Sequence, residues 1–151
     1  MLSAPVLRVR EGTPEFESYR TMRIGLWPMP VNENQRETVE IVRSADWAVF
    51  VACASTGAMA GFAEAHLREF AEGAVSSPVG YLEGLYVAPK LRRLGIGTAL
   101  VHAAEEWARS RGCTEMGSDS NCENEVSIAM HGRLSYREVE RQVCFIKTLN
   151  V

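Results

Sequence analysis

Hydrophobic and polar positions recur along this chain with two periods, and each period predicts a kind of element. Short apolar or alternating runs predict strands, and apolar positions three or four residues apart predict amphipathic helices. The predicted strands are residues 4–10, 48–53, 59–67, 81–87, 113–117 and 139–149. The predicted helices are residues 14–24, 35–43, 95–110 and 124–134. Because no linker or internal repeat interrupts this order, we expect one domain over residues 1–151, an α/β fold in which helices flank a mixed sheet on both sides.

Two irregular stretches separate the predicted elements. Residues 26–30 contain Pro28 and Pro30, which exclude a regular helix or strand there. Residues 68–79 are small and polar and include Gly73 and a Ser-Ser-Pro triplet. The second stretch is therefore predicted to be a loop that can cover a binding site.

The composition is that of a soluble globular protein, with 46% hydrophobic and 23% charged residues. A net charge of −3 argues against nucleic acid, because binding to a phosphate backbone needs a basic surface. No apolar run approaches the length of about 18 residues that a membrane span needs. The 4 cysteines form no zinc-type pair, so free thiols in a reducing cytosol are expected. We expect a cytoplasmic protein that has no metal and binds neither nucleic acid nor membrane.

The strongest functional motif joins the predicted strand at 81–87 to the helix at 95–110. It reads Arg92-Arg93-Leu94-Gly95-Ile96-Gly97 and is followed by Thr98. Unpaired N–H groups and the helix dipole make the first turn of a helix an anion site, and glycines let phosphate oxygens approach the backbone. The third glycine of a dinucleotide fingerprint and the lysine of a P-loop are both absent. The motif predicts a pyrophosphate site; the alternative is an ordinary helix start with a solvated basic pair.

The spacing Arg92-x-x-Gly95-x-Gly97 after Leu85-Tyr86-Val87-x-Pro89 closely resembles the acetyl-coenzyme A motif of the GNAT N-acetyltransferases. The resemblance covers nearly the whole chain, including the order of strands and helices. It implies the GNAT fold, whose central sheet is mixed but mostly antiparallel, and acetyl-CoA as cosubstrate. The cofactor-binding residues that it implies are Leu85, Tyr86, Val87, Arg92, Arg93, Leu94, Gly95, Ile96, Gly97, Thr98 and Asn124.

The family often places a tyrosine seven residues after the asparagine that contacts the cofactor, and this tyrosine protonates the departing thiolate. His131 stands at that position here. The family's Leu-Gly-Phe triplet is also replaced, by Leu134-Ser135-Tyr136. His131 is accordingly a candidate general acid, and the alternative is a histidine on a helix face without a chemical role.

A narrower resemblance is to the aminoglycoside 6′-N-acetyltransferases. The segments that carry it are Leu26-Trp27-Pro28, Ser76-Ser77-Pro78, Tyr81-Leu82-Glu83-Gly84, Ser118-Asp119 and Met130-His131. It implies acetylation of the 6′-amine of an aminoglycoside, hence antibiotic resistance, and a homodimer. One departure is Phe70, where relatives often have a tyrosine before Ser-Ser-Pro. The alternatives are a GNAT enzyme acting on a polyamine or a protein N-terminus, and a non-catalytic acyl-CoA-binding module.

Acetylation of an amine requires a base, because an aliphatic ammonium has a pKa of about 10 and must lose a proton before it attacks. Glu83 is the candidate, since it interrupts an apolar strand and, by the period of two, shares a face with Tyr81, Leu85 and Val87. The alternative is a paired or edge glutamate. No sequence feature indicates a covalent intermediate, so direct attack in a ternary complex is expected.

Further acidic and aromatic residues are candidates for binding the substrate. Asp119 follows a predicted strand, where α/β sheets tend to place ligand contacts, and it is a candidate contact for an amino group in catalysis and binding. Glu140, expected on the last strand, is a candidate third carboxylate. Trp27 and Phe70 are candidate apolar walls. The alternatives are a helix cap for Asp119, a solvent-facing strand position for Glu140 and core packing for Trp27.

Overall fold

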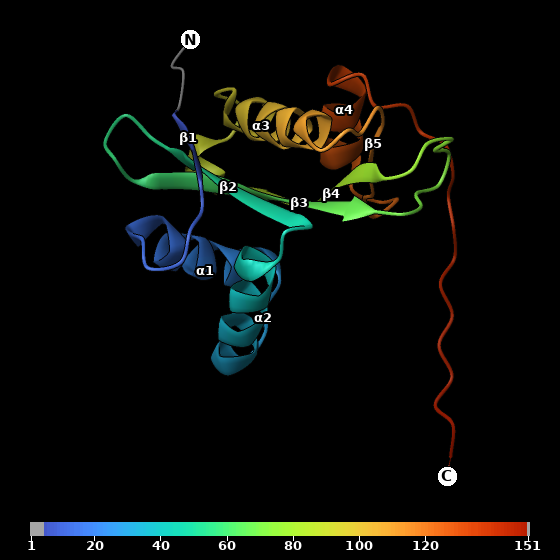
Figure 1. Cartoon of the computed structure of the whole chain (residues 1–151), viewed down its shortest axis with the longest axis horizontal. Helices are drawn as coiled ribbons and strands as arrows, with labels where there is room; N and C mark the ends of the chain where they lie inside the picture. The colour runs from blue at the N-terminus through green and yellow to red at the C-terminus, as the bar shows by residue number, and fades with distance from the viewer. Residues whose placement is uncertain (1–4, 151) are drawn as a thin grey trace. The chain divides into compact units, whose positions relative to one another are not determined.

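The computed structural model describes residues 5–150. The chain divides into two compact units, Met1–Asp119 and Ser120–Val151. The first unit holds the sheet and three α-helices, and the second holds α4 (Glu125–Arg133) and the C-terminal segment (Figure 1). No helix among the described residues has the length and apolar character needed to cross a bilayer.

The first unit is built around a five-stranded sheet in the order β1-β2-β3-β4-β5. Its strands are β1 (Val6–Arg8), β2 (Trp47–Cys53), β3 (Met59–Arg68), β4 (Val79–Val87) and β5 (Met116–Ser118). Its helices are α1 (Pro14–Leu26), α2 (Val31–Arg43) and α3 (Ile96–Ser110), with a short 3₁₀ helix, η1, at Pro89–Leu91. Neighbouring strands are antiparallel except for the β4–β5 pair, which is parallel. The mixed, mostly antiparallel sheet is therefore confirmed.

Helices cover both faces of this sheet, as predicted: α1 and α2 lie on one face and α3 on the other (Figure 1). On the α1 side, Phe16 and Tyr19 pack with Val49, Val51 and Phe62 of the sheet. The apolar stripe of α3 is buried on the opposite face, as its helical spacing predicts. The buried residues of that stripe are Ile96, Leu100, Val101, Ala104, Trp107 and Ala108.

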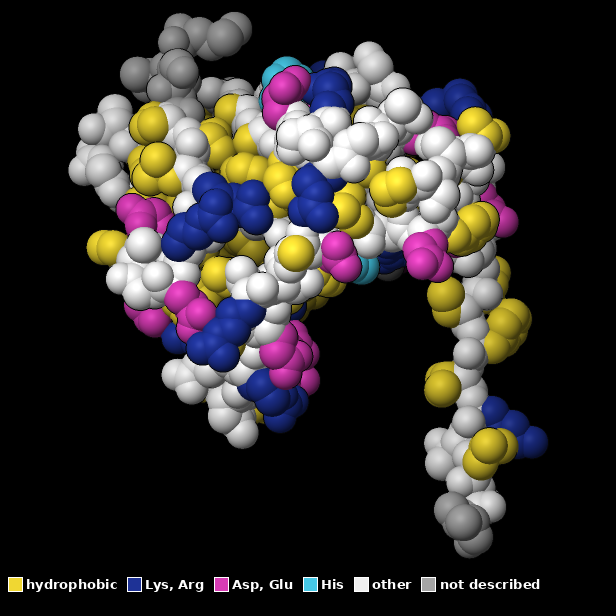
Figure 2. Space-filling view, in the orientation of Figure 1, with side chains coloured by type: hydrophobic (Ala, Val, Ile, Leu, Met, Phe, Trp, Pro, Cys, Tyr) yellow, Lys and Arg dark blue, Asp and Glu magenta, His cyan; other side chains and the backbone are white. Residues whose placement is uncertain are grey.

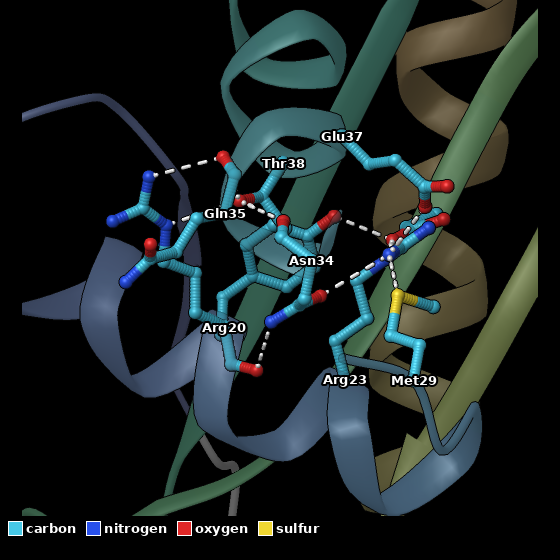
Figure 3. Close-up of polar contacts among 9 residues, drawn as sticks. Arg20, Arg23, Met29, Asn34, Gln35, Glu37 and Thr38 are labelled. Carbon is cyan, nitrogen blue, oxygen red and sulfur yellow. Dashed lines mark hydrogen bonds and ion pairs between the residues drawn. The ribbon is translucent and has the colours of Figure 1, made fainter. Parts of the chain in front are cut away.

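A buried polar network fastens α1 and α2 to the sheet (Figure 3). Glu64 of β3 is 2% exposed, and its Oε1 lies 2.7 Å from Nε of Arg23 on α1. The hydroxyl of Tyr19 also donates to Glu64, and burial raises the pKa of this phenol, which keeps it a proton donor. Arg23 continues to α2, where Nη1 lies 3.2 Å from Oδ1 of Asn34 and 2.9 Å from Oε2 of Glu37. Every charge buried here has a partner.

Two predicted boundaries are displaced for local reasons. Helix α2 begins at Val31, four residues before the predicted start, because the carbonyl of Pro30 accepts the first helical hydrogen bond from Asn34 at 3.1 Å. Strand β5 begins at Met116 rather than at residue 113, because the N–H of Cys113 still closes the end of α3 by donating to Ala108 at 3.0 Å.

The prediction of a strand at residues 139–149 is wrong. Residues 136–150 have no regular secondary structure, and none of the five strands pairs with them. Apolar side chains such as Phe145 and Ile146 are more than 90% exposed. An alternating apolar pattern becomes a strand only where a neighbouring strand supplies its hydrogen bonds, and this segment has no such neighbour among the described residues.

Candidate active site

Glu83 lies at a β-bulge, which explains how a glutamate fits inside this strand. The register of β3 and β4 pairs Ala65 with Leu82 and Glu64 with Gly84, so Glu83 is the extra residue between two consecutive pairs. A bulge bends the strand and redirects a side chain. Glu83 is thereby aimed toward the end of β3, and its side chain is 16% exposed.

The same bulge changes which residues of β4 share a face. Leu85 and Val87 face α3, since a Cβ placed on Gly97 of that helix would lie 3.9 Å from Leu85 Cδ2 and 3.7 Å from Val87 Cγ2. Tyr86 faces the α1 side, where it stacks on Phe62. The prediction that Glu83 shares a face with Leu85 and Val87 is wrong, because the extra residue shifts the period-two count by one.

The carboxylate of Glu83 is paired. Arg68, the last residue of β3, holds both of its oxygens, with Nε 2.7 Å from Oε1 and Nη2 2.8 Å from Oε2. Nδ1 of His66 lies 3.2 Å from Oε1, and the His66 ring is stacked on Trp47 with ring centres 4.2 Å apart. The hydrogen bond to Glu83 raises the pKa of Arg68. Glu83 is therefore a paired glutamate, which was the alternative to a catalytic base. Its partners lie beside other candidate site residues.

Asp119 joins the same cluster through Tyr81. It follows β5 directly, and its Oδ2 accepts a hydrogen bond of 2.8 Å from the Tyr81 hydroxyl. Burial and this hydrogen bond raise the pKa of Tyr81, which keeps the phenol protonated. Cζ of Arg68 lies 3.5 Å from the centre of the Tyr81 ring. Glu83, Arg68, Tyr81 and Asp119 thus form a continuous series, which we call the acidic cluster.

Sequence reasoning missed Arg68, His66 and Tyr81 as members of this site. A signal was present, because Glu64, His66 and Arg68 occupy every second position of β3 and so mark one polar face. Their partners come from other strands, which a pattern within one strand does not reveal.

Trp27 lies beside the bulge. A Cβ added to Gly84 would lie only 2.2 Å from Cη2 of its indole, so the ring sits directly against the backbone next to Glu83. The indole also packs 6.4 Å from the ring of Phe62, and Cζ of Arg23 lies 5.0 Å from its centre. Trp27 is half-buried and packs against the core beside the bulge.

The glycine motif starts α3 as predicted. Gly95 is the N-cap in the left-handed conformation, with φ 84°, and the first helical hydrogen bond runs from Ala99 to Gly95 at 3.1 Å. The N–H groups of Ile96, Gly97 and Thr98 therefore have no partner within the helix. Arg92, Arg93 and Leu94 are exposed, and Nε of Arg92 donates to the Val87 carbonyl at 2.9 Å. These are the features that an anion site at the start of a helix requires, and the binding role of the motif stays a prediction.

Beyond the bulge, β4 has an unpaired edge. Strand β5 pairs only with Gly80, Tyr81 and Leu82, so residues 83–87 have no strand partner on that side within the described chain. An open strand edge of this kind can bind an extended ligand through its backbone groups. One acceptor in this segment, the Val87 carbonyl, is already bound by Arg92.

The loop that carries Phe70 is held by hydrogen bonds to Glu115 near its C-terminal end. The Glu115 carboxylate accepts hydrogen bonds from the N–H groups of Val75 at 2.9 Å and Ser76 at 2.7 Å, and from the Ser76 hydroxyl. These bonds lower the pKa of Glu115. Phe70 itself is 68% exposed, and its role as an apolar wall stays a prediction.

Three predicted site residues belong to the second unit. Asn124 is the N-cap of α4, with Oδ1 accepting from the N–H of Ser127 at 3.1 Å. His131 has Nδ1 2.8 Å from the Ser127 carbonyl and meets Tyr136 edge to face, with centres 5.5 Å apart. Glu140 is exposed and, contrary to expectation, lies in irregular chain rather than on a strand. The functional roles of all three stay predictions.

Known proteins resemble this chain over almost its full length. Residues 16–136 match the acetyltransferase (GNAT) family. Aminoglycoside N(6′)-acetyltransferase type 1 of Klebsiella aerogenes is 43% identical over 99% of this chain and 100% of that protein. The protein of the same name from Stenotrophomonas maltophilia is 41% identical over 95% of this chain and 93% of its own.

Solved structures agree with the sequence comparisons. AAC(6′)-Iy in complex with the bisubstrate analogue CoA-S-monomethyl-acetylneamine has a TM-score of 0.91 at 33% identity and covers 98% of this chain and 100% of its own. AAC(6′)-Ih from Acinetobacter baumannii has a TM-score of 0.89 at 32% identity, with the same coverage of both chains. The chain therefore belongs to the acetyltransferase (GNAT) family, in the branch that contains the aminoglycoside N(6′)-acetyltransferases.

Proposed function

We propose that this protein transfers the acetyl group of acetyl-CoA to the 6′-amino group of an aminoglycoside and so confers antibiotic resistance. The observation that carries the proposal is the similarity, over most of the chain, to several relatives named aminoglycoside N(6′)-acetyltransferase type 1. The acidic cluster supports it, because carboxylates suit a polycationic acceptor. The anion site at the start of α3 suits the pyrophosphate of CoA.

In the proposed reaction, Glu83 takes a proton from the acceptor ammonium, directly or through a water molecule. The neutral amine then attacks the thioester carbonyl, and N–H groups on the unpaired edge of β4 stabilise the oxyanion. Collapse of the tetrahedral intermediate breaks the C–S bond, the former amine nitrogen loses its second proton to solvent, and His131 donates a proton to the CoA thiolate. Asp119 and Glu140 hold further amino groups, and Trp27 and Phe70 form apolar walls.

The cosubstrate occupies the start of α3 and the adjoining β4 in this proposal. Leu85, Tyr86 and Val87 hold the pantetheine arm through their backbone, residues 92–98 hold the pyrophosphate, and Asn124 contacts the cofactor. No metal ion takes part in the proposed reaction.

We further propose that the enzyme is a cytoplasmic homodimer that binds neither nucleic acid nor membrane. Val143, Phe145 and Ile146 are at least 77% exposed in the single chain, and apolar surface of this kind is commonly covered by a partner. All four cysteines are unpaired, which suits a reducing compartment.

Turnover on three acceptors tests the proposed function. With acetyl-CoA, we expect kanamycin to be acetylated with a far higher kcat/KM than spermidine or a peptide N-terminus, and we expect NMR of the product to place the acetyl group on the 6′-nitrogen. Turnover of the peptide with none on kanamycin would contradict the assignment. Binding of acetyl-CoA without turnover of any amine would favour a non-catalytic module.

Substitution of Gly84 by alanine tests whether Trp27 shapes the acceptor site. The new Cβ would lie 2.2 Å from the indole, so the ring has to move away from the bulge. We expect kcat/KM for kanamycin to fall by about tenfold or more, because small misplacements in an active site are costly. The KM for acetyl-CoA should stay the same. The matched control is Gly132→Ala, where a Cβ meets nothing within 4 Å; equal kinetics for the two variants would count against Trp27.

A further inference from the structure

The cation that neutralises Glu83 in this structure belongs to the protein itself. Arg68 holds both carboxylate oxygens, and its guanidinium lies over the face of Tyr81. We propose that Arg68 is an internal competitor of the substrate: it occupies the place of the acceptor ammonium in the free enzyme and is displaced when the acceptor binds. This inference rests on the proposed function and adds a residue that sets the affinity for the acceptor.

The surroundings of the guanidinium are those that would bind a foreign cation. Glu83 supplies a carboxylate at 2.7 and 2.8 Å, and Tyr81 supplies an aromatic face at 3.5 Å from Cζ. Asp119 adds a second negative charge, fixed by the Tyr81 hydroxyl at 2.8 Å, and its charge contributes to the raised pKa of Arg68. A carboxylate together with the face of a tyrosine is a recognised combination for binding an ammonium group. Arg68 therefore makes the contacts with Glu83 and Tyr81 that an ammonium group of the aminoglycoside would make.

While Arg68 is in place, Glu83 has little capacity left for a substrate. Both oxygens accept from the guanidinium, and Oε1 also lies 3.2 Å from His66. A base acts by reaching the proton that it removes, so the ion pair has to open before Glu83 can act on the acceptor. Opening is feasible because the Arg68 side chain is 34% exposed at the end of β3 and can turn into solvent.

Displacement of Arg68 has a measurable cost. An incoming ammonium gains contacts with Glu83 and Tyr81 only as the guanidinium loses the same contacts, so the net gain is smaller than for an unoccupied site. A variant without the charge at residue 68 should bind the cationic acceptor more tightly. A residue that merely orients Glu83 would give the opposite result, since its loss would leave the carboxylate misplaced.

The test compares Arg68→Met with Arg43→Met. Both substitutions remove one arginine that holds a glutamate through two nitrogens, but Arg43 pairs with Glu11 outside the acidic cluster. Calorimetry with kanamycin on CoA-saturated enzyme should show a Kd about fivefold lower for Arg68→Met. The Kd of Arg43→Met should equal that of the wild type. In steady-state assays, Arg68→Met should show the matching decrease in the KM for kanamycin and no change in the KM for acetyl-CoA.

A Kd for kanamycin that is unchanged or higher in Arg68→Met overturns the inference and assigns Arg68 an orienting role. If Arg68→Met does not fold, as judged by its thermal transition, Arg68→Gln takes its place with the same expected result and the same contrary one. The proposed function is contradicted separately, if the wild-type enzyme does not acetylate kanamycin. If the wild type acetylates kanamycin and the Kd of the variant is unchanged, only the role of Arg68 as a competitor is contradicted.

Discussion

Replacing Arg23 by methionine should lower the free energy of unfolding by about 3–5 kcal/mol, because it leaves a buried carboxylate without its partner. The side chains of Arg23 and Glu64 are 8% and 2% exposed, so water cannot replace the lost guanidinium. The same substitution also removes the contacts with Asn34 and Glu37 that join α1 to α2. Urea denaturation followed by circular dichroism measures the change.

Two comparisons make this experiment specific. Arg109→Met removes an arginine whose side chain is 60% exposed on α3 and should cost less than about 1 kcal/mol. The double variant Arg23→Met with Glu64→Met should recover part of the loss, because no charge is then left unpaired in the interior. A similar loss for Arg23→Met and Arg109→Met would show that the network does not carry the stability assigned to it.

Exchanging Glu83 for glutamine should lower kcat/KM for kanamycin by about 10²–10⁴-fold, the usual contribution of a positioned general base. The amide has nearly the shape of the carboxylate but cannot accept the proton. The melting temperature and the KM for acetyl-CoA should change little, which separates a chemical loss from a folding defect. Steady-state kinetics at saturating acetyl-CoA measures the effect.

Glu11→Gln is the control for Glu83→Gln, because Glu11 is also held by two arginine nitrogens but lies on the exposed surface. It should retain wild-type turnover. Should Glu83→Gln keep the full rate, and Asp119→Asn as well, the catalytic site is assigned to the wrong residues.

The features that the sequence predicted well are those determined over a few neighbouring residues. Helix α3 and its start were predictable because the apolar stripe, the glycines and the buried strand before them all lie within one short segment. Asp119 was placed correctly at the end of a strand for the same reason. Glu83 was correctly predicted to lie on a strand, but the face of the sheet that it shares with its neighbours was not.

The features that were missed depend on pairing between distant segments. The bulge at Glu83 exists only in the register of β4 against β3, and the partners Arg68 and Tyr81 come from those two strands. The buried pair of Arg23 and Glu64 joins residues 41 positions apart. The last predicted strand failed because a pattern within residues 139–149 carries no information on whether another strand is available to pair with it.

The extra residue in β4 sets which side chains of this strand face each layer of the molecule. Before and at the bulge, Tyr81 and Glu83 belong to the acidic cluster, whereas Leu85 and Val87 beyond it support the helix that carries the glycine motif. Under the proposed function, substitutions on the acceptor side can therefore accumulate with little effect on the cofactor side. For an enzyme exposed to changing antibiotics, this separation allows drug preference to evolve while the donor stays the same, and it places the length of β4 under selection together with the side chains that the strand carries.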